Sequence, residues 1–322
     1  MTPAAPLASV IVCTRNRADY LEGALDSILA DSPGVGWELI VVDNASTDGT
    51  RAVVEARQAE AKDVPVEYAL EERLGHSHAR NRGIADARGE LIVFTDDDVI
   101  VEAGWLDALC AGFTEPDVMA AGGKIVPRWP SAPPGWMSAR LSGVLAVTDY
   151  GEEARDLTGD EYPVGANMAI RRSALGDAAS AFDTRLGHRG GGYFGFDEHE
   201  LFAALRERGR LVYRPDAVVH HRILPDRMTW EGMRRASLHN GYGSMRADRL
   251  REGTRVPLRS AVPEATRALF QALRRRRRNG GRDDVDPEAA FDEFHAYWVV
   301  GRWIEILFGE SAAARWLLSR LV

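Results

Sequence analysis

Three adjacent acids, Asp96, Asp97 and Asp98, are the strongest chemical feature of the sequence. Taken alone, such a run is more often a solvated turn. Here it follows the apolar run Leu91–Thr95, which is typical of a buried strand, where uncompensated carboxylates would repel and shift one another's pKa values. A divalent cation relieves this repulsion, and Mg²⁺ and Mn²⁺ prefer carboxylate oxygen. Because the first and third side chains of an extended turn point the same way, Asp96 and Asp98 either share a metal, or one meets a ribose.

Two further segments carry candidate ligand-binding side chains. Asp43 ends the apolar run Glu38–Asp43 and is followed by Asn44. A carboxylate in this position either caps a turn or accepts hydrogen bonds from a nucleotide base or a ribose hydroxyl. The basic segment His76–Gly83 can begin a helix whose free N–H groups and guanidinium forks hold phosphate. Arg80 is the candidate there, with a plain surface arginine as the alternative.

Strand-like runs alternate with helix-like segments in the first half of the chain. Ser9–Cys13, Glu38–Asp43, Pro65–Leu70 and Leu91–Thr95 indicate strands. Apolar strands separated by helices predict an α/β fold with a mostly parallel sheet that helices cover on both faces. Ligands bind such sheets beyond the carboxyl ends of the strands. The polar residues expected to converge there are Thr14, Arg15, Asp43, Asn44, Asp96, Asp97 and Asp98.

The second half of the chain has a different composition. Pro127–Pro163 is rich in Pro, Gly, Trp and acids, and long connections of this kind are often functional. Val164–Ile170 and Leu211–His220 indicate two further strands, and Asp197–Arg208 between them indicates a helix.

These patterns predict two regions. Residues 1–228 are expected to form a Rossmann-like α/β domain, with a nucleotide-binding half at 1–100 and an acceptor half at 101–228. Residues 229–322 are expected to form a helical C-terminal region.

Composition limits the classes of function. The chain has 322 residues and a formal net charge of −8, which argues against binding nucleic acid by phosphate neutralisation. Cys13 and Cys110 form no disulfide or zinc pattern and are expected to be buried free thiols of a reducing compartment. No secretory signal precedes Thr14, and charges interrupt the best candidate for a membrane span, Trp298–Val322. We therefore expect a cytoplasmic protein.

The C-terminal region carries arginines and tryptophans that form a further candidate surface. They would dock on an anionic membrane, peripheral to its inner face, or on a partner. The alternative is a helical cap in which the arginine run and the following Gly280-Gly281 pair are a solvated break. The residues are Arg234, Arg235, Arg274–Arg278, Trp298, Trp303 and Trp316.

Seven short segments together resemble the family-two glycosyltransferases of GT-A fold. Each segment alone is a weak signal, but all seven occur in order and at plausible spacing, over roughly residues 8–245. They are Val10–Arg17, Val41–Thr50, Ala79–Ile84, Thr95–Asp98, Gly165–Arg172, Asp197–Leu201 and Pro215–His221.

The resemblance implies an enzyme that moves a sugar from a nucleotide diphosphate-sugar to an unidentified acceptor hydroxyl, assisted by Mn²⁺ or Mg²⁺. UDP-hexose is the default donor. The resemblance places Thr14, Arg15 and Asn16 on one side of the nucleotide, and it places Asp43 on the base.

The remaining roles implied by the resemblance concern the diphosphate, the metal and the sugar. Arg80 would lie near the diphosphate. Asp98 would be the main metal ligand, and Asp96 would face the ribose or the metal, with Asp97 directed elsewhere. Asn167 would line the cavity for the donor sugar or the acceptor.

The catalytic base and a metal-binding histidine also follow from the resemblance. The family usually has Glu-Asp before this helix, with the second acid as base, whereas this chain has Asp197-Glu198. By position Glu198 is the base, with Asp197 as the alternative; a structural role at a helix N-terminus is also open. One base without a protein nucleophile predicts inversion of the anomeric configuration. The pattern Pro-Asp-Ala-x-x-x-His selects His221, and a strand would point His220 to the opposite face.

Two other functions remain open. A sugar nucleotidylyltransferase is also α/β and metal-dependent, but it would have a Gly-rich phosphate loop where this chain has Thr14-Arg-Asn-Arg17. A non-catalytic nucleotide-sugar-binding protein would keep the acids as a binding site only, and the inverted order of Asp197 and Glu198 favours it.

Overall fold

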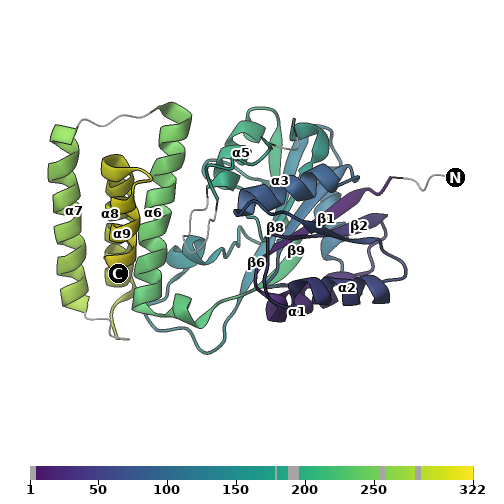
Figure 1. Cartoon of the computed structure of the whole chain (residues 1–322), viewed down its shortest axis with the longest axis horizontal. Coiled ribbons are helices and arrows are strands. Elements are labelled where there is room, and N and C mark those ends of the chain that lie inside the picture. The colour runs from purple at the N-terminus through teal and green to yellow at the C-terminus, as the bar shows by residue number, and fades with distance from the viewer. Residues whose placement is uncertain (1–4, 178–179, 188–195, 254–257, 280–283, 322) are drawn as a thin grey trace. The chain divides into compact units, whose positions relative to one another are not determined.

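The chain is described by a computed structural model that covers residues 5–177, 180–187, 196–253, 258–279 and 284–321. It divides into two compact units (Figure 1). The sheet unit comprises the chain up to Arg128 together with Ala146–Arg185 and Asp197–Arg222. The helical unit comprises chiefly Trp129–Leu145 and the chain from Ile223 onward. The segment Trp129–Leu145, which we expected in the α/β domain, therefore belongs to the helical unit.

Four parallel strands form the first half of the sheet, in the order β3-β2-β1-β4. They are β1 (Ala8–Thr14), β2 (Trp37–Asp43), β3 (Val66–Leu70) and β4 (Leu91–Asp96). The apolar side chains of β1, β2 and β4 are buried, as expected for central strands covered on both faces. Parallel pairing brings the carboxyl ends of these three strands to one edge, where Thr14, Asp43 and Asp96 are the last residues.

The second half of the sheet is mixed, so parallel pairing prevails only in the first half. β8 runs antiparallel between β4 and β6, while β9 pairs parallel with β6 and antiparallel with β5 and β7. The segment between β6 and β8 contains no α-helix, and an antiparallel neighbour needs none. These strands are β5 (Val99–Val101), β6 (Val118–Arg128), β7 (Arg155–Asp156), β8 (Asn167–Arg171) and β9 (Arg210–Arg222).

Helices cover both faces of the sheet (Figure 1). Val10 and Val12 of β1 pack in the core that includes α1, α2 and α4, whereas Ile11 packs in the core that includes α3 and α5. This alternation follows from the two-residue period of a strand. The predicted fold class is therefore confirmed. The helices are α1 (Ala18–Ala30), α2 (Thr50–Glu60), α3 (His76–Asp86), α4 (Trp105–Cys110) and α5 (Asp197–Arg206), with 3₁₀ helices η1 (Ala111–Phe113) and η3 (Arg172–Ala174).

The helical unit contains the helices predicted after Thr229. Thr229 caps the first of them by accepting from the N–H of Gly232, and Asp286 caps the third in the same way. The third helix contacts the first and the second, and Tyr297 and Ile304 belong to the core that they share. The helices are α6 (Trp230–Glu252), α7 (Leu258–Asn279), α8 (Pro287–Phe308) and α9 (Ala312–Arg320), with 3₁₀ helices η2 (Ala139–Leu145) and η5 (Pro225–Met228).

The arginine run that we expected in a solvated break is helical. Arg274–Arg278 form the last turns of α7, because the helix continues to Asn279. The Gly280-Gly281 pair lies outside the described residues.

The other C-terminal arginines and tryptophans have different environments. Arg234 is buried against Glu293, and its Nε lies 2.6 Å from Glu293 Oε1. Trp298 and Trp303 are half-buried, whereas Trp316 is exposed. Arg235 is paired with Glu231 within α6. None of the helices in the described ranges is long and apolar enough to cross a bilayer.

Candidate active site

The predicted metal ligands meet at the carboxyl end of β4. Asp96 is the last residue of β4, and Asp98 follows in the turn to β5. β5 pairs with β9 in a register that sets Val99 opposite His221. One ligand atom from each of Asp96, Asp98 and His221 lies within 4.8 Å of the others, and we call these residues the metal-site cluster. His220 points elsewhere, with its Nε2 2.6 Å from Glu102 Oε1.

The metal-site cluster fits a divalent cation. Burial, and then the charge of Asp98, raise the pKa of Asp96 from 3.8 to about 7. Its carboxylate accepts no hydrogen bond from any residue that the structure describes. Despite its burial, Asp98 has a pKa below its usual range because His221 hydrogen-bonds to it and Arg17 lies beside it. Two carboxylates and an imidazole suit a transition metal such as Mn²⁺, whereas Mg²⁺ prefers oxygen ligands.

Arg17, which precedes α1, links Asp97 to the metal-site cluster. Its Nη1 lies 2.8 Å from Asp97 Oδ1 and 2.8 Å from Asp98 Oδ2. The other oxygen of Asp97 accepts from Thr14 Oγ1 at 2.7 Å. Arg17 was not among the predicted site residues, because its side chain could have pointed in any direction from the loop. The guanidinium partly offsets the charge of the acidic run.

The two candidate bases begin α5 and contact Arg80 of α3. Asp197 Oδ2 accepts from Ser77 Oγ at 3.0 Å and from Arg80 Nη1 at 3.2 Å. Glu198 Oε1 accepts from Arg80 Nη2 at 2.5 Å, and its Oε2 accepts from the N–H of Gly165 at 2.9 Å. Arg80, Asp197 and Glu198 form what we call the base cluster. Both acids are therefore held by the arginine that the resemblance assigned to the diphosphate.

Arg80 is almost completely buried, with 2% of its surface exposed. Its guanidinium carbon lies 5.0 Å from the ring centre of Phe182 and 5.8 Å from that of Phe94, where the ring faces favour a cation. A Cβ on Gly165 would lie 2.1 Å from Arg80 Nη2 and 2.2 Å from Glu198 Oε1. Glycine is therefore required at position 165 for the base cluster to keep this geometry.

The two clusters influence each other electrostatically. Arg80 lowers the pKa of Asp96, and Glu198 raises it. Cys13 lies on β1 beside Asp96, and burial raises the pKa of its thiol to about 12. The thiol of the metal-free protein is therefore protonated near neutral pH.

Asp43 uses both of its oxygens within the protein. Its Oδ1 accepts from the N–H of Ser46 at 2.8 Å, and its Oδ2 accepts from the hydroxyl of Tyr68 at 2.8 Å. Tyr68 lies on β3, and the sequence analysis did not select it. Burial and this hydrogen bond raise the pKa of Tyr68 to about 12. The phenol of Tyr68 thus orients the Asp43 carboxylate, which was predicted to contact the base of the nucleotide.

The loop after β1 contacts the loop after β2. Asn16 donates its N–H to Ser46 Oγ at 2.9 Å and accepts from the N–H of Thr47 at 2.7 Å. Arg15 is half-buried and has no side-chain hydrogen bond or ion pair to the residues that the structure describes. Asn16 therefore joins the two loops, while the guanidinium of Arg15 has no protein partner among those residues.

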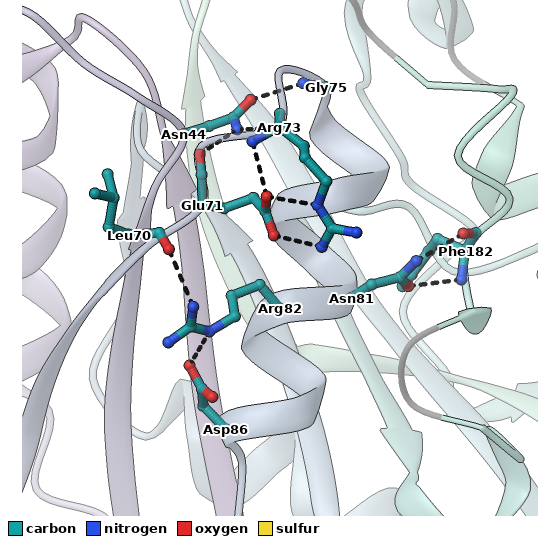
Figure 2. A network of polar contacts seen from close by, with 9 residues as sticks. All are labelled: Asn44, Leu70, Glu71, Arg73, Gly75, Asn81, Arg82, Asp86 and Phe182. Atoms are coloured by element: carbon teal, nitrogen blue, oxygen red, sulfur yellow. Dashed lines mark hydrogen bonds and ion pairs between the residues drawn. The ribbon is translucent and has the colours of Figure 1, made fainter.

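Asn44 positions the start of α3 (Figure 2). Its Nδ2 donates to the carbonyl oxygens of Glu71 at 2.9 Å and Arg73 at 2.8 Å, and its Oδ1 accepts from the N–H of Gly75 at 2.8 Å. The amide is thus occupied by the loop between β3 and α3. Its observed role is to hold that loop.

Asn81 of α3 is hydrogen-bonded to Phe182 (Figure 2), whose ring lies against the Arg80 guanidinium. The amide of Asn81 donates to the carbonyl of Phe182 and accepts from its N–H, both at 2.9 Å. This paired hydrogen bond fixes one ring of the apolar surroundings in which the base cluster lies.

Asn167, expected to line a cavity, is fully buried. Its Oδ1 accepts from Trp105 Nε1 at 2.8 Å, and its Nδ2 donates to the carbonyls of Lys124 at 3.0 Å and Ala217 at 2.8 Å. Every polar atom of the amide is occupied between α4, β6, β8 and β9. The structure therefore places Asn167 in the packing behind the site.

Comparisons with known proteins agree with this fold. The model of glycosyl transferase family 2 matches residues 9–178. A glucosyl-dolichyl phosphate glucuronosyltransferase of Haloferax volcanii is 24% identical over 249 residues, covering 75% of this chain and 77% of that protein. A succinoglycan biosynthesis protein of Rhizobium meliloti is 26% identical over 261 residues, covering 78% and 79%.

A solved structure shares the fold. The mannosyltransferase of Pyrobaculum calidifontis in complex with GDP-Man and Mn²⁺ superposes with a TM-score of 0.63 at 21% identity, covering 96% of this chain and 89% of that one. The family match spans more than half of the chain and includes Arg17, Arg80 and the acidic run. The chain therefore belongs to glycosyl transferase family 2, and its fold is of the GT-A type.

Proposed function

We propose that this protein transfers a glycosyl group from a nucleotide diphosphate-sugar to an acceptor hydroxyl, with metal assistance and inversion of the anomeric configuration. The observation that carries the proposal is the juxtaposition of the metal-site cluster and the base cluster in one sheet unit. Displacement at an anomeric carbon needs charge stabilisation for a leaving diphosphate and a base for the attacking hydroxyl.

Asp96, Asp98 and His221 are the proposed metal ligands. When bound, the metal supplies positive charge that stabilises the diphosphate leaving group. Arg17 holds Oδ2 of Asp98, whereas His221 faces Oδ1 of the same carboxylate. Asp43, oriented by Tyr68, is proposed to accept from the nucleotide base.

Glu198 is the proposed base because it is the more accessible acid. Its side chain is 19% exposed, against 3% for Asp197. Arg80 and the N–H of Gly165 orient the carboxylate, which takes the proton of the acceptor hydroxyl as the oxygen attacks the anomeric carbon. The bond to the diphosphate breaks in the same step. With no separate nucleophile, attack comes from the face opposite the leaving group and the configuration inverts.

The substrates are proposed at the level of class. The family resemblance makes UDP-hexose the default donor, and the Pyrobaculum mannosyltransferase was solved with GDP-Man, so guanine nucleotides belong in the same test. The Haloferax relative acts on a glucosyl-dolichyl phosphate, which is a lipid-linked sugar. A hydroxyl of a lipid-linked sugar is therefore the proposed acceptor, with the helical unit in peripheral contact with the inner face of the membrane.

A second candidate is a non-catalytic nucleotide-sugar-binding protein. One observation favours it: Arg80 occupies both acids of the base cluster in ion pairs. A sugar nucleotidylyltransferase has no such support, because the loop Thr14–Arg17 contains no glycine.

A donor panel with Mn²⁺ tests the proposal. We expect one donor to release its nucleoside diphosphate in the presence of sugar acceptors, and we expect EDTA to abolish the release. NMR of the product should show the inverted anomeric configuration. A retained configuration would exclude single displacement, and tight donor binding without turnover of any donor would favour the binding protein.

A further inference from the structure

Helix α7 leaves three large apolar side chains exposed on the side away from the core of the helical unit. Among the α7 positions whose side chains the structure describes, Ala261, Ala268, Ala272 and Asn279 are buried, and Leu269 is partly buried against the core of the helical unit. Phe270 is nevertheless 67% exposed, Val262 50% and Leu273 41%. An ordinary amphipathic helix of a folded domain buries its large apolar residues, whereas α7 leaves these three exposed and packs Leu269 only partly against the core.

The exposed apolar residues lie on one side of the helix. Val262 and Phe270 are two turns apart, and Leu273 follows Phe270 by three residues, so the three share one stripe. We call Val262, Phe270 and Leu273 the α7 stripe. It lies on the helix face turned away from the buried alanines.

Arginines flank the α7 stripe. The helix contains seven arginines and one acid, Glu264, in a chain whose net charge is −8. Within the run Arg274–Arg278, only Arg275 forms an ion pair with a residue that the structure describes, namely Asp292. Arg274 and Arg277 follow Phe270 by four and seven residues, which places their charges beside its ring.

We propose that α7 docks on an anionic lipid surface, with the α7 stripe in the boundary between headgroups and acyl chains. Arginines without acidic partners attract anionic headgroups, and exposed phenylalanine and leucine side chains gain from leaving water. A nucleic acid or an acidic protein surface would pair with the arginines of α7 but would leave the apolar side chains of the α7 stripe in water. A lipid surface accounts for both features. The inference rests on the proposed function for the lipid-linked acceptor, whereas docking itself requires no turnover.

Co-sedimentation with vesicles tests the docking. The full chain is mixed at low salt with vesicles of phosphatidylcholine alone, or of phosphatidylcholine with phosphatidylglycerol. We expect binding only to the anionic vesicles and its loss at high salt, because the electrostatic part is screened. Phe270→Ser with Leu273→Ser should lower the bound fraction at least about fivefold, and so should Arg274→Glu with Arg277→Glu.

Matched controls separate docking from misfolding and from nonspecific adsorption. Leu70→Ser with Leu74→Ser removes two leucines of similar exposure from the sheet unit, and Arg51→Glu with Arg185→Glu makes the same change of net charge elsewhere. Both controls should bind as the unchanged protein does. Circular dichroism and thermal melting verify that each variant is folded.

Three outcomes would overturn the proposal. They are equal binding to neutral vesicles, unchanged binding of the folded Phe270 and Leu273 variant, and binding to duplex DNA that the same variant retains. Donor binding measured without lipid is the separate readout of the proposed function. Vesicle binding without donor binding would reject the proposed function and support the docking. Donor binding without vesicle binding would support the proposed function and reject the docking.

Discussion

The metal-site cluster and the base cluster both bury carboxylates, but their charges are balanced differently. In the base cluster, Asp197 and Glu198 share a buried arginine, and each accepts a further hydrogen bond, from Ser77 or Gly165. In the acidic run, Asp97 and Asp98 share Arg17, whereas Asp96 is not paired with it, and burial raises the pKa of Asp96 to about 7.

This difference indicates what each cluster still requires. In the base cluster, the chain itself supplies the hydrogen-bond donors and the positive charge that the two carboxylates require. The metal-site cluster carries excess negative charge that a cation would offset. We therefore expect mutations in the base cluster to affect stability and catalysis through position, and mutations in the metal-site cluster to act through metal binding.

Asp98→Asn should have the largest effect on transfer. The change removes a proposed metal ligand, and kcat/KM should fall by about 10⁴-fold, equivalent to about 5 kcal/mol of lost charge stabilisation. Asp97→Asn is the matched control, because Asp97 faces Thr14 and Arg17 and lies outside the metal-site cluster. Steady-state kinetics at several Mn²⁺ concentrations measure both, and equal losses would remove the distinction between the two acids.

Glu198→Gln should come next, with a loss of about 10³-fold in kcat, the range of a general base. Donor affinity should be unchanged, and the melting temperature should fall less than for Asp197→Asn, because the Glu198 side chain is 19% exposed against 3% for Asp197. Asp197→Asn should instead lower the free energy of unfolding by about 3 kcal/mol, because it breaks a buried ion pair. Glu200→Gln, in the same helical turn, is the control. If the Asp197 variant lost turnover at unchanged stability while the Glu198 variant kept it, the two roles would be exchanged.

Gly165→Ala tests whether position alone matters in the base cluster. The new Cβ would displace Arg80 and Glu198, and a misplacement of about 1 Å costs on the order of 10²-fold in rate. Mn²⁺ affinity should stay the same. Gly36→Ala, where a Cβ has nothing within 4 Å, should leave the rate unchanged. Full activity of the Gly165 variant would contradict the assigned geometry.

Arg17→Gln should have a smaller effect. It should lower the stability of the metal-free protein and increase the stabilisation that Mn²⁺ provides. Removing the guanidinium leaves more uncompensated charge, so the metal-free protein should lose about 1 kcal/mol of stability. The increase in melting temperature on adding Mn²⁺ should then be larger than in the unchanged protein. A smaller increase would show that Arg17 supports the metal instead of substituting for its charge.

The last prediction concerns the pH dependence of stability. The pKa of Asp96 is raised from 3.8 to about 7, so between these values the folded protein binds more protons than the unfolded chain. The metal-free protein should therefore lose stability as pH rises through this window, and stabilisation by Mn²⁺ should grow over the same range. Thermal melts with EDTA or Mn²⁺ at pH 5, 6 and 7 measure both trends. A metal-free protein that gains stability toward pH 7 would contradict this assignment.

Several elements were predictable because they depend on local patterns. β1, β2 and β4 follow from short apolar runs, and the acids at their ends follow from strand polarity. The opposite directions of His220 and His221 follow from the two-residue period of a strand. The mixed half of the sheet was not predictable in the same way, because short strands can pair in either direction.

Three-dimensional packing decided the rest of the site. Arg17, Tyr68 and Gly165 were not selected, because their roles depend on which atoms lie within reach across separate elements. Asn44 and Asn167 were predicted to contact a ligand, and the folded chain shows that their amides also bond to backbone groups and to Trp105.

The sequence by itself determined the α/β class, the family resemblance and the residue types at the strand ends, since periodicity and short motifs are properties of neighbouring residues. Only the tertiary structure decided that Arg80 holds Asp197 and Glu198, and that Asp96 has a raised pKa. It also decided that α7 exposes Phe270. Burial and charge balance depend on groups far apart in the chain, so they arise only when the chain folds.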